Sequence, residues 1–198
     1  EFYGRPFEVT PDVLIPRPET EHVVEEALRL AAPAMRIADV GCGSGAIAVT
    51  LSIETGAPVW ATDISLPALR VAARNAARLG GRVHLAACDL TAAFASCSLD
   101  LIVSNPPYVP LSSGPGLQRE VRDYEPRIAL FAGETGLEAY QRLIGEAERV
   151  LRAGGALVME LGFSASGSVR RMLGPRWGEV NLSPDLAGIP RVISARLR

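Results

Sequence analysis

Short apolar runs alternate along this chain with helical patterns rich in alanine, arginine and leucine, and this alternation constrains the fold more than any other feature. The runs 36–40, 59–63, 83–87 and 99–104 are typical of strands, and residues 45–54 and 66–79 are typical of helices. Strands that are joined through helices pair in parallel, and strands that are apolar throughout are buried on both faces. We therefore predict an α/β fold.

The second half of the chain extends the same pattern. Helices are predicted over 136–151 and 166–173, and strands over 156–161, 177–182 and 192–197. Together these elements predict a doubly wound, Rossmann-like sheet of seven strands that is mostly parallel with an antiparallel last strand, and a cofactor at the carboxyl ends of the first strands. Residues 105–134 between the halves are rich in proline, glycine and serine, and a connection of this length is usually a functional loop.

Length and composition narrow the class of protein. A chain of 198 residues suits one domain with a full core, and its net charge of −2 argues against nucleic acid as a direct substrate. No apolar run reaches the roughly 18 to 20 residues of a membrane helix, so we expect a cytoplasmic protein without a membrane partner. The three cysteines form no CxxC pair, and His22 and His84 are isolated, which predicts no metal site and no Cys-His nucleophile.

The turn between the first strand and its helix reads DVGCGSG. Glycines at such a turn let the backbone bend sharply and approach a ligand at the helix N-terminus, although they also occur for packing alone. The sequence therefore predicts a nucleotide-cofactor loop, formed by Asp39, Gly41, Cys42, Gly43, Ser44 and Gly45.

Two acids follow at the ends of the next strands. At the position of Asp63 a carboxylate can accept hydrogen bonds from both hydroxyls of a ribose. The alternative is that Asp63 caps the helix that starts near Leu66. Asp89 can accept the adenine amino group while Leu90 packs on the ring. The loop reads GxGxG rather than GxGxxG, which favours S-adenosylmethionine over NAD and leaves dinucleotide binding as the alternative. The predicted cofactor contacts beyond the loop are Asp63, Ile64, Asp89, Leu90 and Asn105.

The fourth strand runs directly into Asn105, Pro106, Pro107 and Tyr108. The Asn105 side-chain carbonyl and the Pro106 main-chain carbonyl can accept the two protons of one NH2 group, so that its lone pair faces a methyl donor. Pro107 stiffens the turn, and Tyr108 can stack on a flat substrate group. We predict Asn105, Pro106 and Tyr108 as catalytic residues and all four as substrate contacts. The alternative is a proline-rich turn that only ends a strand.

The NPPY tetrapeptide after a GxGxG loop resembles the amino-methyltransferases, which act on DNA adenine, ribosomal RNA guanine or protein glutamine. The segments 2–5 (FYGR), 13–21 (VLIPRPETE), 124–126 (YEP) and 185–188 (DLAG) narrow the resemblance to the HemK/PrmC family of protein-(glutamine-N5) methyltransferases. The likeness covers essentially the whole chain. It implies the class I fold of S-adenosylmethionine-dependent methyltransferases, with S-adenosyl-L-homocysteine as the product.

The resemblance also implies a substrate and a site. In this family the substrate is the glutamine of the Gly-Gly-Gln loop of class I peptide chain release factors, and a sister branch modifies a ribosomal protein. By that resemblance residues 105–108 hold the glutamine amide, residues 41–45 with Asp63 and Leu90 hold the cofactor, and the segment from Arg17 to Glu21, with Arg17 and Glu19 as substrate contacts, borders the active site. Glu19 and Glu21 equally suit the positive end of a helix.

Family members carry an N-terminal helical domain that grips the release factor, and the chain begins where the linking hairpin would start. We therefore expect a linker β-hairpin over 1–18 and the catalytic domain over 19–198, without the helical domain. We also expect the segment 109–134 to close over the site, and unchanged protease sensitivity with cofactor and substrate peptide would count against closure. The alternatives are a nucleic-acid amino-N-methyltransferase, a ribosomal-protein glutamine methyltransferase, and a cofactor-binding module without catalysis.

Overall fold

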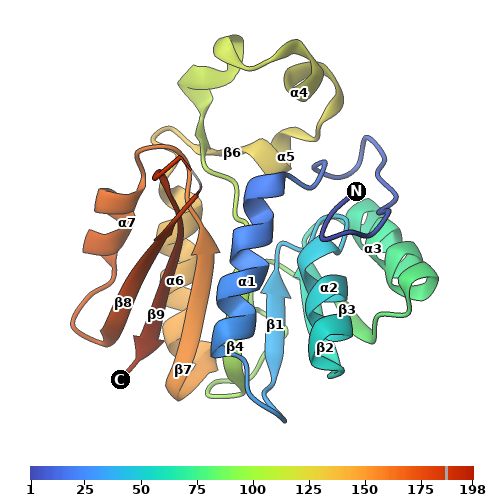
Figure 1. Cartoon of the computed structure of the whole chain (residues 1–198). Helices are drawn as coiled ribbons and strands as arrows, with labels where there is room; N and C mark the ends of the chain where they lie inside the picture. The colour runs from blue at the N-terminus through green and yellow to red at the C-terminus, as the bar shows by residue number, and fades with distance from the viewer. Residues whose placement is uncertain (186) are drawn as a thin grey trace.

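A seven-stranded sheet of order β3-β2-β1-β4-β7-β9-β8 forms the centre of the molecule (Figure 1). The computed structural model describes residues 1–185 and 187–198. Only β9 runs antiparallel to its neighbours, while the other adjacent strands pair in parallel. The predicted α/β fold with an antiparallel last strand is confirmed. The strands are β1 (Ile37–Val40), β2 (Val59–Asp63), β3 (Val83–Ala87), β4 (Leu99–Ser104), β7 (Leu151–Glu160), β8 (Trp177–Pro184) and β9 (Pro190–Leu197).

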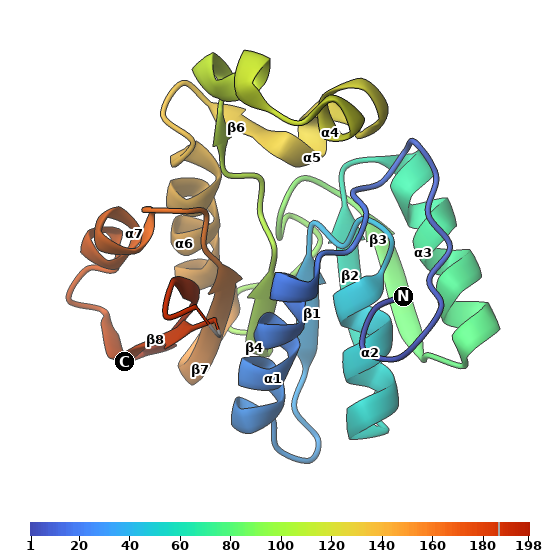
Figure 2. The same ribbon diagram turned by 45° about the horizontal axis from the view of Figure 1, so that its top comes forward.

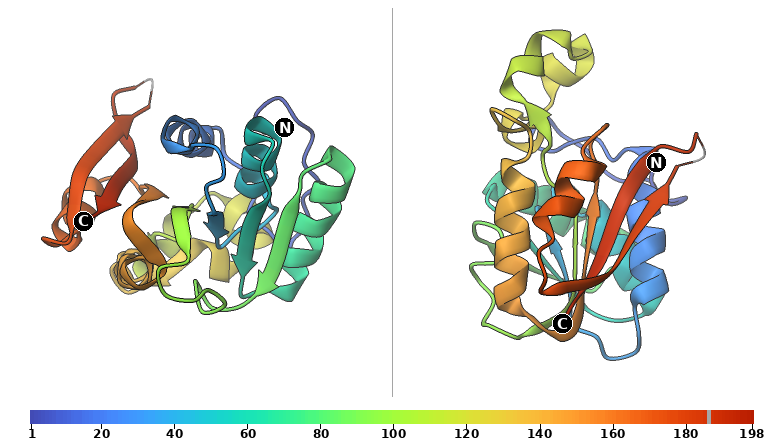
Figure 3. Two further views of the ribbon diagram at one scale, coloured as in Figure 1. Left: turned by 90° about the horizontal axis from the view of Figure 1, so that it is seen from below. Right: turned by 90° about the vertical axis from the view of Figure 1, so that its left-hand side faces the viewer.

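Helices cover both faces of the sheet (Figure 3). One face carries α1 (Glu21–Leu30), α2 (Ala46–Thr55) and α3 (Leu66–Leu79), and the other carries α6 (Glu138–Val150) and α7 (Ser166–Met172). The buried apolar residues accordingly form two large clusters, one between the sheet and each helical layer. Every residue of β1 and β4 is buried, as the apolar runs predict for strands covered on both sides.

Local sequence explains where these helices begin and end. The Ser65 side chain accepts a hydrogen bond from the backbone N–H of Ala68 and so caps α3, with a proline in its first turn. The helix ends at Gly80, which adopts a left-handed conformation. On α1, Val23, Val24 and Ala27 share one face and are fully buried against the sheet. The bounds of α3 and of β1 to β4 agree with the sequence prediction to within one residue. The strand predicted over 156–161 instead begins at Leu151, directly after α6.

The proline-rich segment after β4 contains short elements where the sequence predicted an irregular loop. These are β5 (Val109–Pro110), the 3-10 helix η2 (Leu111–Gly116), α4 (Arg119–Tyr124), α5 (Arg127–Leu130) and β6 (Phe131–Gly133), with β5 and β6 paired in parallel. Residues 109–133, called the cap below, lie above the carboxyl edge of the sheet (Figure 2). Each element is too short for apolar periodicity to reveal it.

Residues 1–17 alternate turns with extended backbone, and Phe2 and Arg5 form an isolated antiparallel bridge around the first turn. Phe2 is buried and joins the cluster under α1 and α2, which fixes the start of the chain to the core. A 3-10 turn, η1 (Pro18–Thr20), leads into α1. Leu186 of the DLAG segment lies outside the described residues. Of the helices in the described ranges, none is both long and apolar enough to cross a lipid bilayer.

Candidate active site

A cavity of about 510 Å³ opens at the carboxyl ends of β1, β2 and β4, beneath the cap. Its wall combines the β1–α2 turn, the residues that follow β2 and β3, the turn after β4, and residues of the cap and α6. Ligands of doubly wound sheets bind at this edge because parallel strands end there together. The cavity lies where the sequence predicts the cofactor.

Backbone hydrogen bonds hold the glycine loop against β2. The N–H groups of Gly41 and Cys42 donate to the Thr62 carbonyl oxygen, at 2.8 and 2.9 Å. Gly45 has φ +80°, and a Cβ atom at this position would lie 3.0 Å from Cβ of Ala72 in α3. A side chain at position 45 would therefore both strain the backbone and push α2 away from α3. Of the predicted loop residues, Gly41, Cys42, Gly43 and Ser44 line the cavity, and Gly45 lies behind the wall.

Asp63 lines the cavity and is held by two backbone donors. Its Oδ2 accepts from the N–H of Gly43 at 2.9 Å, and its Oδ1 accepts from the N–H of Ser65 at 2.9 Å. The cap of α3 is Ser65, so the alternative that Asp63 itself serves as the N-cap does not apply. The bonds fix the carboxylate at the cavity wall next to Ile64, which also lines it.

Asp39 lies under the glycine loop rather than in the cavity wall. It is fully buried, and its Oδ2 accepts from the N–H of Ala48 at 3.0 Å. Its Oδ1 has no hydrogen-bond partner among the described residues. Burial raises the pKa of this carboxyl from 3.8 to about 7, the nearby Asp63 charge adds to the increase, and the Ala48 N–H opposes it. Asp39 can thus act on the cavity through its charge but not by contact.

Asp89 and Leu90 line the opposite part of the cavity, as predicted. The Asp89 carboxylate pairs with Arg142 of α6 at 2.6 Å, a partner that the sequence analysis did not identify. The Thr62 hydroxyl donates to the Leu90 carbonyl oxygen at 2.8 Å and ties this segment to β2. These contacts place a carboxylate and an apolar side chain side by side at the edge of the cavity.

Three of the four NPPY residues line the cavity, namely Asn105, Pro106 and Pro107. The Tyr108 ring does not belong to the wall. It packs on Gly162, where an added Cβ atom would lie 2.8 Å from the ring, and its hydroxyl donates to Glu160 Oε1 at 3.2 Å. Burial and the Glu160 charge raise the Tyr108 pKa, so the phenol is neutral. The ring thus packs beside the turn against Gly162, and its stacking on the substrate stays a prediction.

Thr20 and Glu160 support the site. The sequence predicts Thr20 only as part of the segment that borders the site, and it predicts no role for Glu160. Thr20 lines the cavity, and its hydroxyl donates to Glu160 Oε2 at 2.5 Å and accepts from Asn105 Nδ2 at 3.0 Å. Glu160 is 2% exposed, and burial raises its pKa. Thr20 stands inside the quoted VLIPRPETE segment, but its partner is 140 residues away, and no local pattern links the two.

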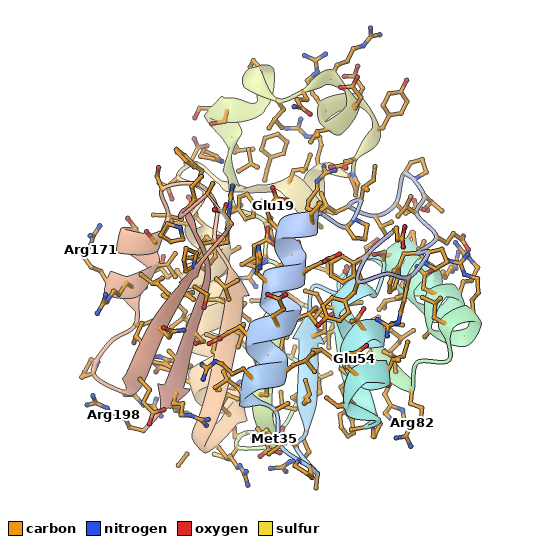
Figure 4. All side chains as sticks on the ribbon, in the orientation of Figure 1. Glu19, Met35, Glu54, Arg82, Arg171 and Arg198 are labelled. Atoms are coloured by element: carbon orange, nitrogen blue, oxygen red, sulfur yellow. The ribbon has the colours of Figure 1, made fainter. Side chains whose placement is uncertain are left out.

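Arg17 and Glu19, the predicted substrate contacts at the start of α1, do not line the cavity. Figure 4 shows Glu19 at the upper end of this helix, below the cap. Arg17 Nη2 donates to both carboxylate oxygens of Glu125 in the cap, at 2.7 and 2.8 Å. The Glu125 side chain is 3% exposed. Arg17 therefore joins the N-terminal segment to the cap instead of facing the cavity.

Replacing Arg17 with methionine is expected to loosen the cap. The change leaves the buried Glu125 carboxylate without its guanidinium partner, which costs up to about 3 kcal/mol, the lower end of the range for buried pairs, because the Arg17 side chain is 33% exposed. Amide hydrogen exchange of residues 119–130 should become at least about tenfold faster. The matched control is Arg122→Met, because its partner Asp123 is 37% exposed and loses little. Equal exchange in both variants would contradict the joining role of Arg17.

Comparisons with known proteins agree with this architecture. Residues 22–113 match the family model described as the methyltransferase small domain. A methyltransferase from Pyrococcus furiosus superposes with a TM-score of 0.72 at 18% identity, over 98% of this chain and 89% of that one. The ribosomal protein L11 methylase from Lactobacillus delbrueckii superposes with a TM-score of 0.66 at 20% identity, over 92% of this chain and 81% of that one. The fold is thus that of class I S-adenosylmethionine-dependent methyltransferases.

Sequence relatives identify the family. The release factor glutamine methyltransferase of Koribacter versatilis is 46% identical over 200 residues, which are 99% of this chain and 71% of the relative. That of Nitratidesulfovibrio vulgaris is 47% identical over 204 residues, 99% of this chain and 69% of the relative. The chain belongs to the release factor glutamine methyltransferase family, and the resemblance inferred from the sequence is confirmed.

Proposed function

We propose that the chain transfers a methyl group from S-adenosylmethionine to the side-chain amide nitrogen, N5, of the glutamine in the Gly-Gly-Gln loop of class I peptide chain release factors. Family membership supports this reaction. The observation that carries it is that Asn105 and Pro106 line the same cavity as the glycine loop and Asp63. One cavity thus combines groups suited to a nucleoside cofactor with acceptors suited to an amide NH2.

The residues at the cavity fit a positively charged nucleoside cofactor. Asp63 and Asp89 line the wall, and Asp39 lies buried below the loop, where its Oδ1 meets no hydrogen-bond donor of the described residues. These acids suit the ribose hydroxyls, the adenine amino group and the positive charges of S-adenosylmethionine, while Ile64 and Leu90 suit the faces of the base. When bound, S-adenosylmethionine supplies an electrophilic methyl group, and its sulfur leaves as the neutral thioether of S-adenosyl-L-homocysteine.

The protein's own contribution to the reaction is to hold the amide. The Asn105 side-chain carbonyl and the Pro106 main-chain carbonyl accept the two amide protons, which places the nitrogen lone pair toward the methyl carbon. As the nitrogen becomes positive, its protons become more acidic and both hydrogen bonds strengthen, so the contacts stabilise the transition state more than the bound substrate. The excess proton then leaves to water. Residues 19–198 form the catalytic domain in this proposal, and residues 1–18 form its linker.

Methyl transfer to a purified class I release factor tests the proposal. With radiolabelled S-adenosylmethionine we expect label on the wild-type release factor and none on the variant whose Gly-Gly-Gln glutamine is replaced with alanine. Mass spectrometry should place one added methyl group on that glutamine. Ribosomal protein and ribosomal RNA serve as competing substrates. Label on either of these, with none on the release factor, would overturn the proposal in favour of the sister branch or of a nucleic-acid methyltransferase.

A further inference from the structure

A chain of hydrogen bonds joins the ends of three elements that are distant in sequence. Asn105 follows β4, Thr20 precedes α1, and Glu160 ends β7. Asn105 Nδ2 donates to Thr20 Oγ1 at 3.0 Å, and Thr20 Oγ1 donates to Glu160 Oε2 at 2.5 Å. Thr20 and Glu160 are 3% and 2% exposed as whole residues, so water competes little for these bonds.

The chemistry of these groups fixes the direction of each bond. Both carboxyl oxygens of Glu160 accept a hydrogen bond from a hydroxyl, Oε1 from Tyr108 and Oε2 from Thr20, which is the pattern of an ionised carboxylate. The single hydroxyl proton of Thr20 therefore goes to Glu160. The Thr20 oxygen then has only lone pairs to offer, and Asn105 must turn its NH2 group toward it. The Asn105 carbonyl oxygen is left for the cavity, where an acceptor is required. An inverted amide would set two acceptors against each other and would present a donor to the substrate NH2 group.

Glu160 itself is held from two sides. The Tyr108 hydroxyl donates to its Oε1 at 3.2 Å, and the Tyr140 hydroxyl donates to its main-chain carbonyl oxygen at 3.0 Å. The Tyr140 oxygen in turn accepts from the N–H of Gly162 at 2.9 Å. Glu160 therefore contacts Tyr108 directly and Asn105 through Thr20, and so supports both ends of the turn from residue 105 to residue 108.

We propose that Thr20 and Glu160 are positioning residues, which fix the amide of Asn105 with its oxygen toward the substrate nitrogen. The inference rests on the proposed function, because the required orientation is set by an NH2 substrate. Neither residue takes part in bond making or breaking. Thr20 orients the Asn105 amide directly. Glu160 acts indirectly, because it accepts the hydrogen bond from the Thr20 hydroxyl and so leaves the Thr20 oxygen as an acceptor.

Kinetics of Thr20→Val tests this role, because valine matches the shape of threonine and removes both hydrogen bonds. We expect kcat for release factor methylation to fall about 10- to 100-fold, the range for loss of a hydrogen bond to a charged group at a buried site. The KM for the release factor and the Kd for S-adenosylmethionine should change less than about threefold. Thr20→Ser keeps the hydroxyl and should retain at least about one third of kcat. An unchanged kcat in Thr20→Val would overturn the inference.

A double variant separates positioning from general damage. In an Asn105→Ala background no amide remains to be oriented, so adding Thr20→Val should lower the residual rate less than about twofold. A loss in this background as large as that in the wild-type background would show that Thr20 acts independently of Asn105. Glu160→Gln, which retains an acceptor oxygen for Thr20, should keep more activity than Thr20→Val, and the reverse order would also contradict the inference.

Nuclear magnetic resonance of the side-chain amide gives a measurement that needs no methyl transfer. The Asn105 NH2 signals are identified by their loss in Asn105→Ala, and backbone amide spectra establish that each variant is folded. We expect Asn105 NH2 exchange with solvent to accelerate at least about tenfold in Thr20→Val and to stay near the wild-type rate in Thr20→Ser. Equal rates in all three proteins would refute the orientation. If the wild-type chain methylates no release factor, the proposed function fails, and this experiment still decides the positioning role.

Discussion

Replacing Asn105 with alanine should lower kcat for glutamine methylation by about 10²- to 10³-fold, the usual effect of removing one preorganised hydrogen-bonding group from a transition state. Asn105 lines the cavity next to Pro106, and its Nδ2 is already used by Thr20, which leaves its oxygen as an acceptor. Without that oxygen, one amide proton of the substrate loses its partner and the nitrogen lone pair is free to rotate away. Rapid-quench measurement of labelled methyl transfer gives the rate of the chemical step.

The Asn105→Ala effect should be confined to the chemical step. The Kd for S-adenosylmethionine, measured by calorimetry, is expected to change less than about fivefold, because in the proposed site Asp63 and the glycine loop supply the main contacts to the cofactor. Asn181→Ala is the matched control, since this asparagine lies on β8 and is exposed. It should keep the wild-type kcat. If Asn105→Ala retains more than about one tenth of kcat, the assignment of Asn105 as the amide acceptor is wrong.

The meeting of Asn105 with the glycine loop was predictable because of one topological rule. Both segments follow apolar strands of a βα pattern, and parallel strands end at the same edge of the sheet. The same reasoning placed Asp63 and Asp89 near the loop. β1 and β4 proved to be neighbours in the sheet, which brings the end of each strand to one cavity. Local sequence and strand direction were sufficient for this part of the site.

Side-chain pairing across the site was not predictable in the same way. The partners Thr20 and Glu160 are separated by 140 residues, and Arg17 and Glu125 by 108. Neither pair follows from periodicity or from a strand end. Tyr108 illustrates the difference, since the motif suggested a ring stacked on the substrate, and the structure packs the ring on Gly162. The Tyr108 ring fits there only because Gly162, after β7, has no side chain, and the NPPY motif alone gives no information about that residue.

Replacing Asp39 with asparagine is expected to stabilise the cofactor-free protein at pH 8. Burial raises the Asp39 pKa from 3.8 to about 7, so the unfolded state loses this proton first as the pH rises. The contribution of Asp39 to stability therefore falls between about pH 4 and pH 7 and stays low above that range. The two pKa values differ by about 3, which corresponds to at most about 4 kcal/mol. The asparagine side chain of the variant does not ionise and escapes this penalty.

Part of that gain is lost because the asparagine NH2 group of the variant would occupy the place of Asp39 Oδ1, where residues 1–185 and 187–198 offer no hydrogen-bond partner. We expect a net stabilisation of about 1–3 kcal/mol at pH 8, or an increase in Tm of roughly 3–10 °C for a chain of this size. At pH 4 the wild-type carboxyl is protonated, and the advantage should vanish. Thermal unfolding at both pH values measures the difference. Asp123→Asn is the control. Arg122 lowers the Asp123 pKa, so the folded protein favours the Asp123 charge, and removing that charge should not stabilise the protein.

The same Asp39→Asn substitution should weaken binding of S-adenosylmethionine, because a negative charge below the loop attracts a cationic cofactor. At pH 8 the Kd is expected to rise at least about tenfold, the equivalent of about 1.4 kcal/mol. The neutral-sulfur product S-adenosyl-L-homocysteine should lose less affinity than the sulfonium cofactor. If the variant is more stable at pH 8 and binds S-adenosylmethionine as tightly as the wild type, the buried Asp39 charge does not contribute to cofactor affinity. A lower Tm at pH 8 would instead show that the Asp39 charge is satisfied in the folded protein.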